Sequence, residues 1–201
     1  RSEITWAELR IKVAATAAAM RAEGVVVGDR VVAWVPNVTE AIVYGLGALS
    51  IGAVVSTASP DFAPHAVEDR FGQVEPKIFL AADGYNYNGK YFDCTEKAAE
   101  IEKLLPTLKK TVRVSQFESW IAPFMGTEPV FEQLPFDHPG FVLFSSGTTG
   151  KPKCITHSGA GVMLKAQAEL LYQFNVLKGN KIFFFTTCGW MMWNWLTMAL
   201  G

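Results

Sequence analysis

The chain has 201 residues, of which 50% are hydrophobic and 18% are charged, with a formal net charge of −1. This length suits one sizeable domain or a large part of a bigger protein, and the composition excludes an intrinsically disordered chain. The sequence contains no block of like charges, whereas a surface that binds nucleic acid or an anionic membrane usually carries a basic stripe. We therefore expect neither nucleic acid nor a membrane among the partners.

The cysteines give no sign of a disulfide framework or a zinc site. Cys94, Cys154 and Cys188 are an odd number without a short Cys-x-x-Cys spacing. They indicate three reduced thiols in a protein of the cytosol, and we expect a cytoplasmic location.

Two uncharged stretches, 41–58 and 182–201, are long enough to cross a membrane. Glycines interrupt the first, and Thr186, Gly189 and Asn194 interrupt the second, so we interpret both as buried elements of a folded domain.

The ends of the chain predict a fragment of a longer protein. The sequence starts at Arg1 without a methionine and stops at Gly201 within an apolar run, whereas natural termini are usually polar.

In chain order, turn and cap signals separate stretches of helix and strand character. Thr5 to Glu8 is a capping-box pattern that opens an alanine-rich helix ending near Gly24, and Asn37 to Glu40 repeats the cap pattern before a second helix. The expected strands are 30–36, 52–59, 77–81, 111–114 and 141–144, and the helices between them are 37–49, 64–71 and 95–105. This alternation predicts an α/β fold of βαβ units with a mostly parallel sheet, and the continuous apolar runs at 30–36 and 52–59 are typical of its buried strands.

The same pattern suggests how the chain is organised. Residues 1–115 form a first β-α portion, and residues 116–138, where three prolines break the periodicity, form a surface crossing. Residues 139–201 form a second portion that begins with a new strand.

A loop of small polar residues follows that strand, with the sequence Ser145-Ser146-Gly147-Thr148-Thr149-Gly150-Lys151-Pro152-Lys153. The two glycines permit backbone angles that turn successive amides toward one anion. The hydroxyl groups add donors, and Lys153 adds a positive charge. The loop is therefore suited to hold the β- and γ-phosphates of ATP while pyrophosphate leaves.

Two other kinds of loop have a similar sequence. A Walker-type loop requires a glycine where Ser145 stands and a serine or threonine where Pro152 follows Lys151, so that motif fails at two positions. A polar hairpin that merely connects two strands would have a similar composition, and this alternative stays open.

With this loop and its flanks, the sequence resembles the acyl-adenylate-forming superfamily of acyl-CoA synthetases, luciferases and peptide-synthetase adenylation domains. The likeness covers almost the whole chain and is greatest to the acetoacetyl-CoA synthetase subfamily. The segments that carry it are 4–9, 28–31, 36–37, 51–53, 59–62, 69–73, 87–90, 131–136 and 189–195. The resemblance implies a partial AMP-binding domain over 1–201, from the large N-terminal domain of such an enzyme.

The resemblance also implies a two-step ligation. Acetoacetate attacks the α-phosphorus of ATP, which gives an acyl-adenylate and pyrophosphate, and the thiol of CoA then displaces AMP. Enzymes of this kind use Mg²⁺ with the ATP. The partners implied are acetoacetate and the C-terminal remainder of the same enzyme, since the family's adenine motif, ribose aspartate, hinge and C-terminal lysine lie beyond this chain.

The family pattern assigns roles to three groups of residues. The residues expected to bind the ATP phosphates are Ser145, Ser146, Gly147, Thr148, Thr149, Gly150 and Lys153. Lys153 and Thr148 are the expected catalytic residues, and Lys153 is preferred over Lys151. Contacts to CoA fall to Tyr87, Asn88, Gly89 and Lys90, although Lys90 as a solvated surface lysine explains the same sequence. The acyl pocket falls to Thr187, Gly189, Trp190, Met191 and Met192, where Trp and Met surfaces would bury the apolar part of the acid.

Neighbouring residues receive other interpretations. Trp193 and Trp195 are expected in the core, and His157 is a packed histidine with at most a minor nucleotide role. Cys188 lacks a histidine at nucleophile spacing and is given no catalytic role. Two alternative functions remain at this point, a ligase of acetate or propionate and a non-catalytic nucleotide-binding module.

Overall fold

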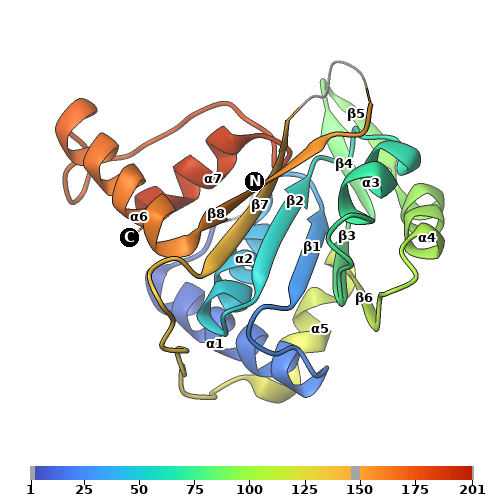
Figure 1. The fold of residues 1–201 in the computed structure, drawn as a ribbon, viewed down its shortest axis with the longest axis horizontal. Coiled ribbons are helices and arrows are strands. Elements are labelled where there is room, and N and C mark those ends of the chain that lie inside the picture. Colours follow the sequence, from blue (N-terminus) through green and yellow to red (C-terminus); the bar gives the residue numbers. More distant parts are fainter. Residues whose placement is uncertain (1–2, 146–149, 201) are drawn as a thin grey trace.

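The computed structural model describes residues 3–145 and 150–200 (Figure 1). The strands are β1 (Arg30–Trp34), β2 (Val54–Ala58), β3 (Ile78–Ala81), β4 (Gly84–Tyr87), β5 (Lys90–Asp93), β6 (Lys110–Arg113), β7 (Pro139–Ser145) and β8 (Lys153–Ser158). The α-helices are α1 (Trp6–Ala22), α2 (Thr39–Ser50), α3 (Pro64–Phe71), α4 (Thr95–Leu104), α5 (Phe117–Ile121), α6 (Gly159–Ala168) and α7 (Met191–Thr197). Short 3-10 turns are η1 (Val114–Gln116), η2 (Ala122–Phe124) and η4 (Met198–Leu200), and η3 (Glu169–Gln173) is a π-helical turn.

Six strands form one sheet in the order β6-β3-β1-β2-β7-β8. Its neighbours pair in parallel except for β7 and β8, which are antiparallel. The predicted α/β fold with a mostly parallel sheet is therefore confirmed. β1 and β2 are almost wholly buried because helices cover both faces of the sheet, as their continuous apolar sequences indicated.

The two faces of the sheet build two hydrophobic cores. Along β1, Val31 and Ala33 pack with helices α1, α2 and α5, whereas Val32 and Trp34 pack with α3 and α4. This division follows from the pleat, since successive side chains of a strand point to opposite faces. Figure 1 shows α1 and α2 on one face of the sheet and α3 and α4 on the other, near β3 and β6.

The two predicted helix caps have different outcomes. At α1 the capping box forms: the Thr5 hydroxyl accepts from the Glu8 amide, and the Glu8 carboxylate accepts from the Thr5 amide at 2.8 Å. At α2 the cap prediction was wrong, because Val38 holds the cap position without a side-chain bond. The oxygen of Asn37 instead accepts a hydrogen bond from the Trp193 indole at 3.0 Å.

Several elements went unpredicted. The hairpin β4–β5 turns on Asn88 and Gly89, both at positive φ, and α5 places Phe117 and Ile121 in the core. Helices α6 and α7 were not predicted either: α6 has a serine cap, Ser158, that was overlooked in the sequence, and α7 has no side-chain cap. Within residues 3–145 and 150–200, no helix has the length and apolarity that a membrane crossing requires.

Candidate functional site

The predicted phosphate loop starts and ends on paired strands. Ser145, the last residue of β7, stands opposite Lys153, the first residue of β8. Gly150 adopts φ of +149°, a backbone region that favours glycine. Ser146, Gly147, Thr148 and Thr149 lie outside the described residues. The loop thus joins two antiparallel strands, a topology that fits both phosphate binding and a plain hairpin.

Helix α3 and the turn that follows it contact the second half of this loop. The Gln73 side-chain amide donates to the Pro152 carbonyl at 2.9 Å, and the Lys151 ammonium lies 3.9 Å from the Asp69 carboxylate. Lys153 is exposed and makes no ion pair with a carboxylate of the described chain. The two lysines therefore differ: Lys151 lies toward α3, and Lys153 is the one whose strand position faces Ser145.

The segment before α7 is anchored to the carboxyl ends of the two central strands. The Thr57 hydroxyl, at the end of β2, donates to the Cys188 carbonyl at 2.5 Å. The Cys188 thiol in turn donates to the Pro36 carbonyl, just beyond β1, at 3.4 Å. Together with the bond from Trp193 to Asn37, these contacts fix the predicted acyl-pocket segment against the edge of the sheet where parallel strands end, the usual ligand-binding edge of such folds.

Cys188 itself is a buried thiol. Burial raises its pKa to about 12, so the thiol stays protonated at neutral pH. Because the thiolate is the reactive form of cysteine, this environment is consistent with no nucleophilic role.

A cavity of about 410 Å³, here called the strand-end cavity, opens between the β7–β8 strands and the segment before α7. Ser145 lines it together with three of the predicted acyl-pocket residues, Gly189, Trp190 and Met191. Residues assigned separately to ATP and to the acid therefore share one space, which has the size of a small-molecule site.

Arg70 also lines the strand-end cavity and was missed from the sequence. Its guanidinium carbon lies 4.7 Å from the centre of the Phe62 ring, and one nitrogen donates to the Ala66 carbonyl at 2.7 Å. Among the described lining residues it is the one Lys or Arg. The sequence signal is weak, since Arg70 reads as an ordinary cation in the last turn of a short helix.

A neighbouring space of about 470 Å³, the helix cavity, lies between β7–β8 and helices α6 and α7. Met191 and Met192 line it, and Met191 also lines the strand-end cavity. Trp193 is 3% exposed and belongs to the core, as predicted. Thr187 lines neither cavity, and its carbonyl accepts from the Trp190 amide at 3.1 Å.

The four predicted CoA residues are not brought to these cavities. Tyr87 and Lys90 pair across the β4–β5 hairpin, with Asn88 and Gly89 as its two-residue turn, and all four are exposed. The hairpin follows the carboxyl end of β3, so it lies at the same edge of the sheet as Ser145.

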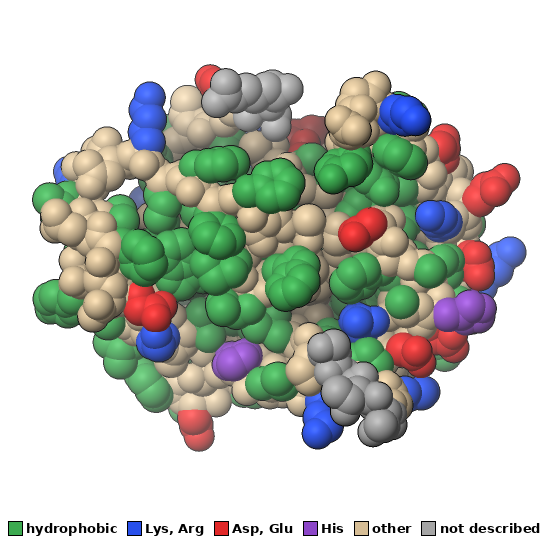
Figure 2. All heavy atoms as spheres, turned by 90° about the horizontal axis from the view of Figure 1, so that it is seen from above, with side chains coloured by type: hydrophobic (Ala, Val, Ile, Leu, Met, Phe, Trp, Pro, Cys, Tyr) green, Lys and Arg blue, Asp and Glu red, His purple; other side chains and the backbone are tan. Residues whose placement is uncertain are grey.

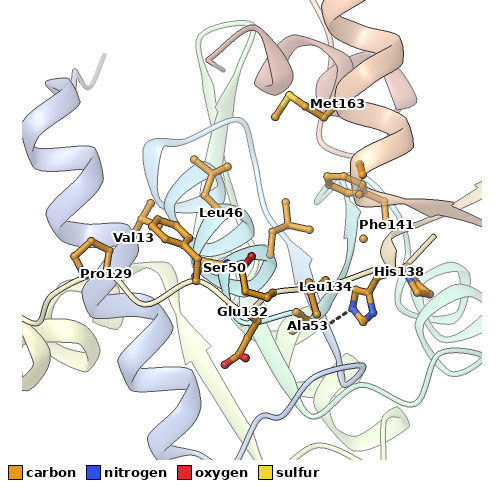
Figure 3. Close-up of a pocket in the computed structure, with 18 of the residues that line it drawn as sticks. Val13, Leu46, Ser50, Ala53, Pro129, Glu132, Leu134, His138, Phe141 and Met163 are labelled. Atoms are coloured by element: carbon orange, nitrogen blue, oxygen red, sulfur yellow. Dashed lines mark hydrogen bonds between the residues drawn. The ribbon is translucent and has the colours of Figure 1, made fainter. Parts of the chain in front are cut away.

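A larger cavity of about 650 Å³ lies at the other edge of the sheet (Figure 3). Val13, Leu46 and Met163 point into it, and His138 beside it bonds the Gly52 carbonyl at 2.9 Å. These residues surround the start of β7 rather than its end, so this cavity is remote from the predicted chemistry.

Seen from above, hydrophobic side chains gather over much of the molecule with few charged ones among them (Figure 2). Elsewhere in the described chain, the segment that leads into α7 has several exposed apolar side chains, among them Phe183, Phe185 and Trp190.

The described residues contain no group of three or more His, Cys, Asp or Glu side chains placed to hold a metal ion. Mg²⁺ in nucleotide sites is commonly bound through substrate phosphates, waters and one or two carboxylates, so ATP can bring most of its ligands.

Comparison with known proteins gives concordant results. The acetoacetyl-coenzyme A synthetase of Rhizobium meliloti (strain 1021) is 44% identical over 98% of this chain, and that of Gallus gallus is 42% identical over 99%. The chain spans 33% of the length of each. The solved structure of acetoacetyl-CoA synthetase from Streptomyces lividans superposes with a TM-score of 0.93 and 41% identity, over 99% of this chain and 32% of that one. The model of the AMP-binding enzyme family matches residues 1–201, and the chain belongs to that family.

Proposed function

We propose that the protein carrying this chain is an acid-thiol ligase that activates acetoacetate with ATP and transfers it to CoA, giving acetoacetyl-CoA, AMP and pyrophosphate. The observation that carries the proposal is the strand-end cavity, where Ser145 meets Gly189, Trp190 and Met191. The names of the relatives support the choice of acid, and the family supports the use of ATP.

In the first step the acetoacetate carboxylate attacks the α-phosphorus of ATP. Backbone amides and hydroxyls of the loop Ser145, Ser146, Gly147, Thr148, Thr149 and Gly150, with the charge of Lys153, stabilise the departing pyrophosphate. Such preorganised donors are usually the largest contribution to catalysis of this kind. Mg²⁺ bound to the phosphates adds to the same neutralisation. Thr148 and Lys153 are the catalytic residues of this proposal.

Arg70 supplies a cation in the strand-end cavity, in addition to Lys153 of the loop. Its stacking on Phe62 holds the planar guanidinium in place, so its remaining donors are available for an anionic substrate group. Gly189 packs closely against Ser59 and Phe62 at the cavity wall. The faces of Trp190 and Met191 cover the apolar carbons of the acid.

In the second step the thiol of CoA attacks the adenylate carbonyl and AMP leaves. The exposed hairpin Tyr87, Asn88, Gly89 and Lys90 lies at the same edge of the sheet, and Lys90 offers a positive charge to the phosphates of CoA.

In this proposal residues 1–201 are part of the large N-terminal domain, with 1–115 and 139–201 as its two portions and 116–138 as the crossing between them. The remainder of the enzyme supplies the contacts to adenine and ribose and the C-terminal lysine. The reaction takes place in the cytosol.

The test is AMP release by the full-length protein with ATP, CoA and either acetoacetate, acetate or propionate. A clear preference in kcat/KM for acetoacetate is expected. Equal or better use of acetate or propionate would contradict the choice of acid, and no AMP release with any acid would point to a non-catalytic nucleotide-binding module.

A further inference from the structure

Asn194 is a buried polar residue whose amide nitrogen has no hydrogen-bond partner among the described residues. It lies in α7 and is 4% exposed. Buried polar groups in folded proteins are nearly always paired, so an orphaned donor calls for an explanation such as a ligand.

The same side chain lines the helix cavity. Met191 precedes it by three positions, which puts both on one face of α7, and Met191 and Met192 also line this space. Asn194 therefore belongs to the wall of a space next to the strand-end cavity, and its amide nitrogen is covered in the present side-chain orientation.

Apart from His157, whose ring has no hydrogen-bond partner among the described residues, the other polar side chains around the cavity are paired. The Ser158 hydroxyl accepts from the Gly161 amide at 3.1 Å, as the cap of α6. Lys165 is paired with Glu169, and the Trp195 indole donates to the same Glu169 carboxylate at 3.2 Å. The charges of this cavity thus neutralise each other, and the Asn194 amide remains as a donor without an acceptor.

We infer that Asn194 determines specificity by donating a hydrogen bond to the 3-keto oxygen of a short β-keto acid whose keto end reaches from the strand-end cavity past Met191, which lines both cavities, into the helix cavity. This inference rests on the proposed function and deepens it. A keto oxygen is an acceptor without a proton, which is what an orphaned N–H requires. The terminal torsion of asparagine turns about a broad, roughly two-fold well, so the amide can present its nitrogen to the cavity.

The geometry also gives a reason for choosing among acids. Methionine and tryptophan surfaces accept the carbons of acetoacetate and of butyrate equally well. Butyrate has a methylene where acetoacetate has its carbonyl, so it would leave the Asn194 donor unpaired. A site built to hydrogen-bond a substrate rejects an analogue that lacks the partner far more strongly than an apolar pocket rejects a change of shape.

The experiment compares kcat/KM for acetoacetate and butyrate in the full-length enzyme and its variants. Asn194→Leu keeps the branched shape of the side chain and removes the amide. The ratio of acetoacetate to butyrate should fall about tenfold or more, mainly through loss of acetoacetate activity. Asn194→Ala is smaller than the native residue, so the neighbouring side chains need not move to accommodate it. It should show the same change in the ratio and replaces the leucine variant if that variant does not fold.

Thr197→Val is the matched control. Thr197 is a buried polar residue of the same helix, its hydroxyl donates to the Asn194 carbonyl at 2.8 Å, and it does not line the helix cavity. Because this variant leaves the Asn194 amide in place and removes no group that faces the substrate, it should leave the ratio within about twofold of the unmodified enzyme.

The outcomes separate the two proposals. If the unmodified enzyme shows no preference for acetoacetate, the proposed function and this inference both fail. If it prefers acetoacetate and the folded Asn194 variants keep that preference, this inference alone is overturned.

Discussion

Ser145 and Lys153 stand opposite each other where β7 and β8 begin to separate, while Lys151 lies 3.9 Å from Asp69 of α3. Of the two lysines, Lys153 is therefore the one positioned beside the start of the phosphate loop.

Replacing Lys153 should disable the first half-reaction. Lys153→Met is expected to lower the rate of acetoacetate-dependent ATP–pyrophosphate exchange by about a hundredfold, the usual effect of removing one electrostatic contact to developing charge. Lys151→Met is the matched control and should cost less than about fivefold, since exposed ion pairs contribute little. Equal losses in the two variants would contradict the assignment of Lys153.

Arg70 should matter for substrate use rather than for stability. Arg70→Ala is expected to lower kcat/KM for acetoacetate by about tenfold, because it removes a held cation from the strand-end cavity. Arg70→Lys keeps the charge but not the planar fork and should recover only part of the activity. Arg10, an exposed residue beside the remote cavity, provides the control Arg10→Ala. An Arg70→Ala enzyme with unchanged kcat/KM would remove Arg70 from the site.

Gly189 has little room for a side chain. A Cβ atom there would lie 3.2 Å from the Ser59 amide nitrogen and 3.4 Å from the Phe62 ring. Gly189→Ala should therefore push the segment away from the end of β2, with a stability cost of about 1–3 kcal/mol and a lower kcat/KM. Urea denaturation and steady-state kinetics of the full-length protein measure both.

The matched control for that change is Gly45→Ala in α2. A Cβ at Gly45 meets nothing within 4 Å, so alanine should raise the free energy of unfolding by up to about 1 kcal/mol through its better helix propensity. If both alanine variants behave alike, the tight contact at Gly189 has no consequence.

The buried Cys188 thiol should make the free energy of unfolding decrease at alkaline pH. Its folded-state pKa of about 12 lies above the unfolded value of roughly 8.5. The unfolded thiol therefore releases its proton first, and the contribution of the buried thiol, complete below pH ~8.5, is lost as the pH rises toward 12. Between pH 7 and pH 10 this loss should be roughly 2 kcal/mol.

The comparison of the unmodified protein with Cys188→Ala isolates this effect. Urea denaturation at pH 7 and pH 10 should show a smaller decline for the variant than for the unmodified protein. Mass spectrometry after alkylation at pH 8 should find the exposed Cys154 modified and Cys188 protected. Rapid alkylation of Cys188 in the folded protein would contradict the burial of its thiol.

Local patterns determined most of the secondary structure. The capping box at Thr5, the Pro64–Phe71 helix and the apolar runs of β1 and β2 depend on neighbours within a few positions, and each appears in the structure at or near the expected residues. The α/β class followed from the alternation of these elements. The proposed phosphate-binding role of the loop after β7 also comes from the sequence alone, because phosphate binding needs particular residue types in a row.

Only the tertiary structure decided which distant residues meet. Asn37 looked like a helix cap, but it accepts from Trp193, 156 positions away, and Thr57 holds Cys188 across 131 positions. No local sequence pattern indicates a function for Arg70 or Asn194. A role is proposed for each only because the structure places it in the wall of a cavity. Local residue patterns indicate which helix, strand or cap a single segment forms. A binding site depends instead on which distant segments the strand order of the sheet brings to one edge.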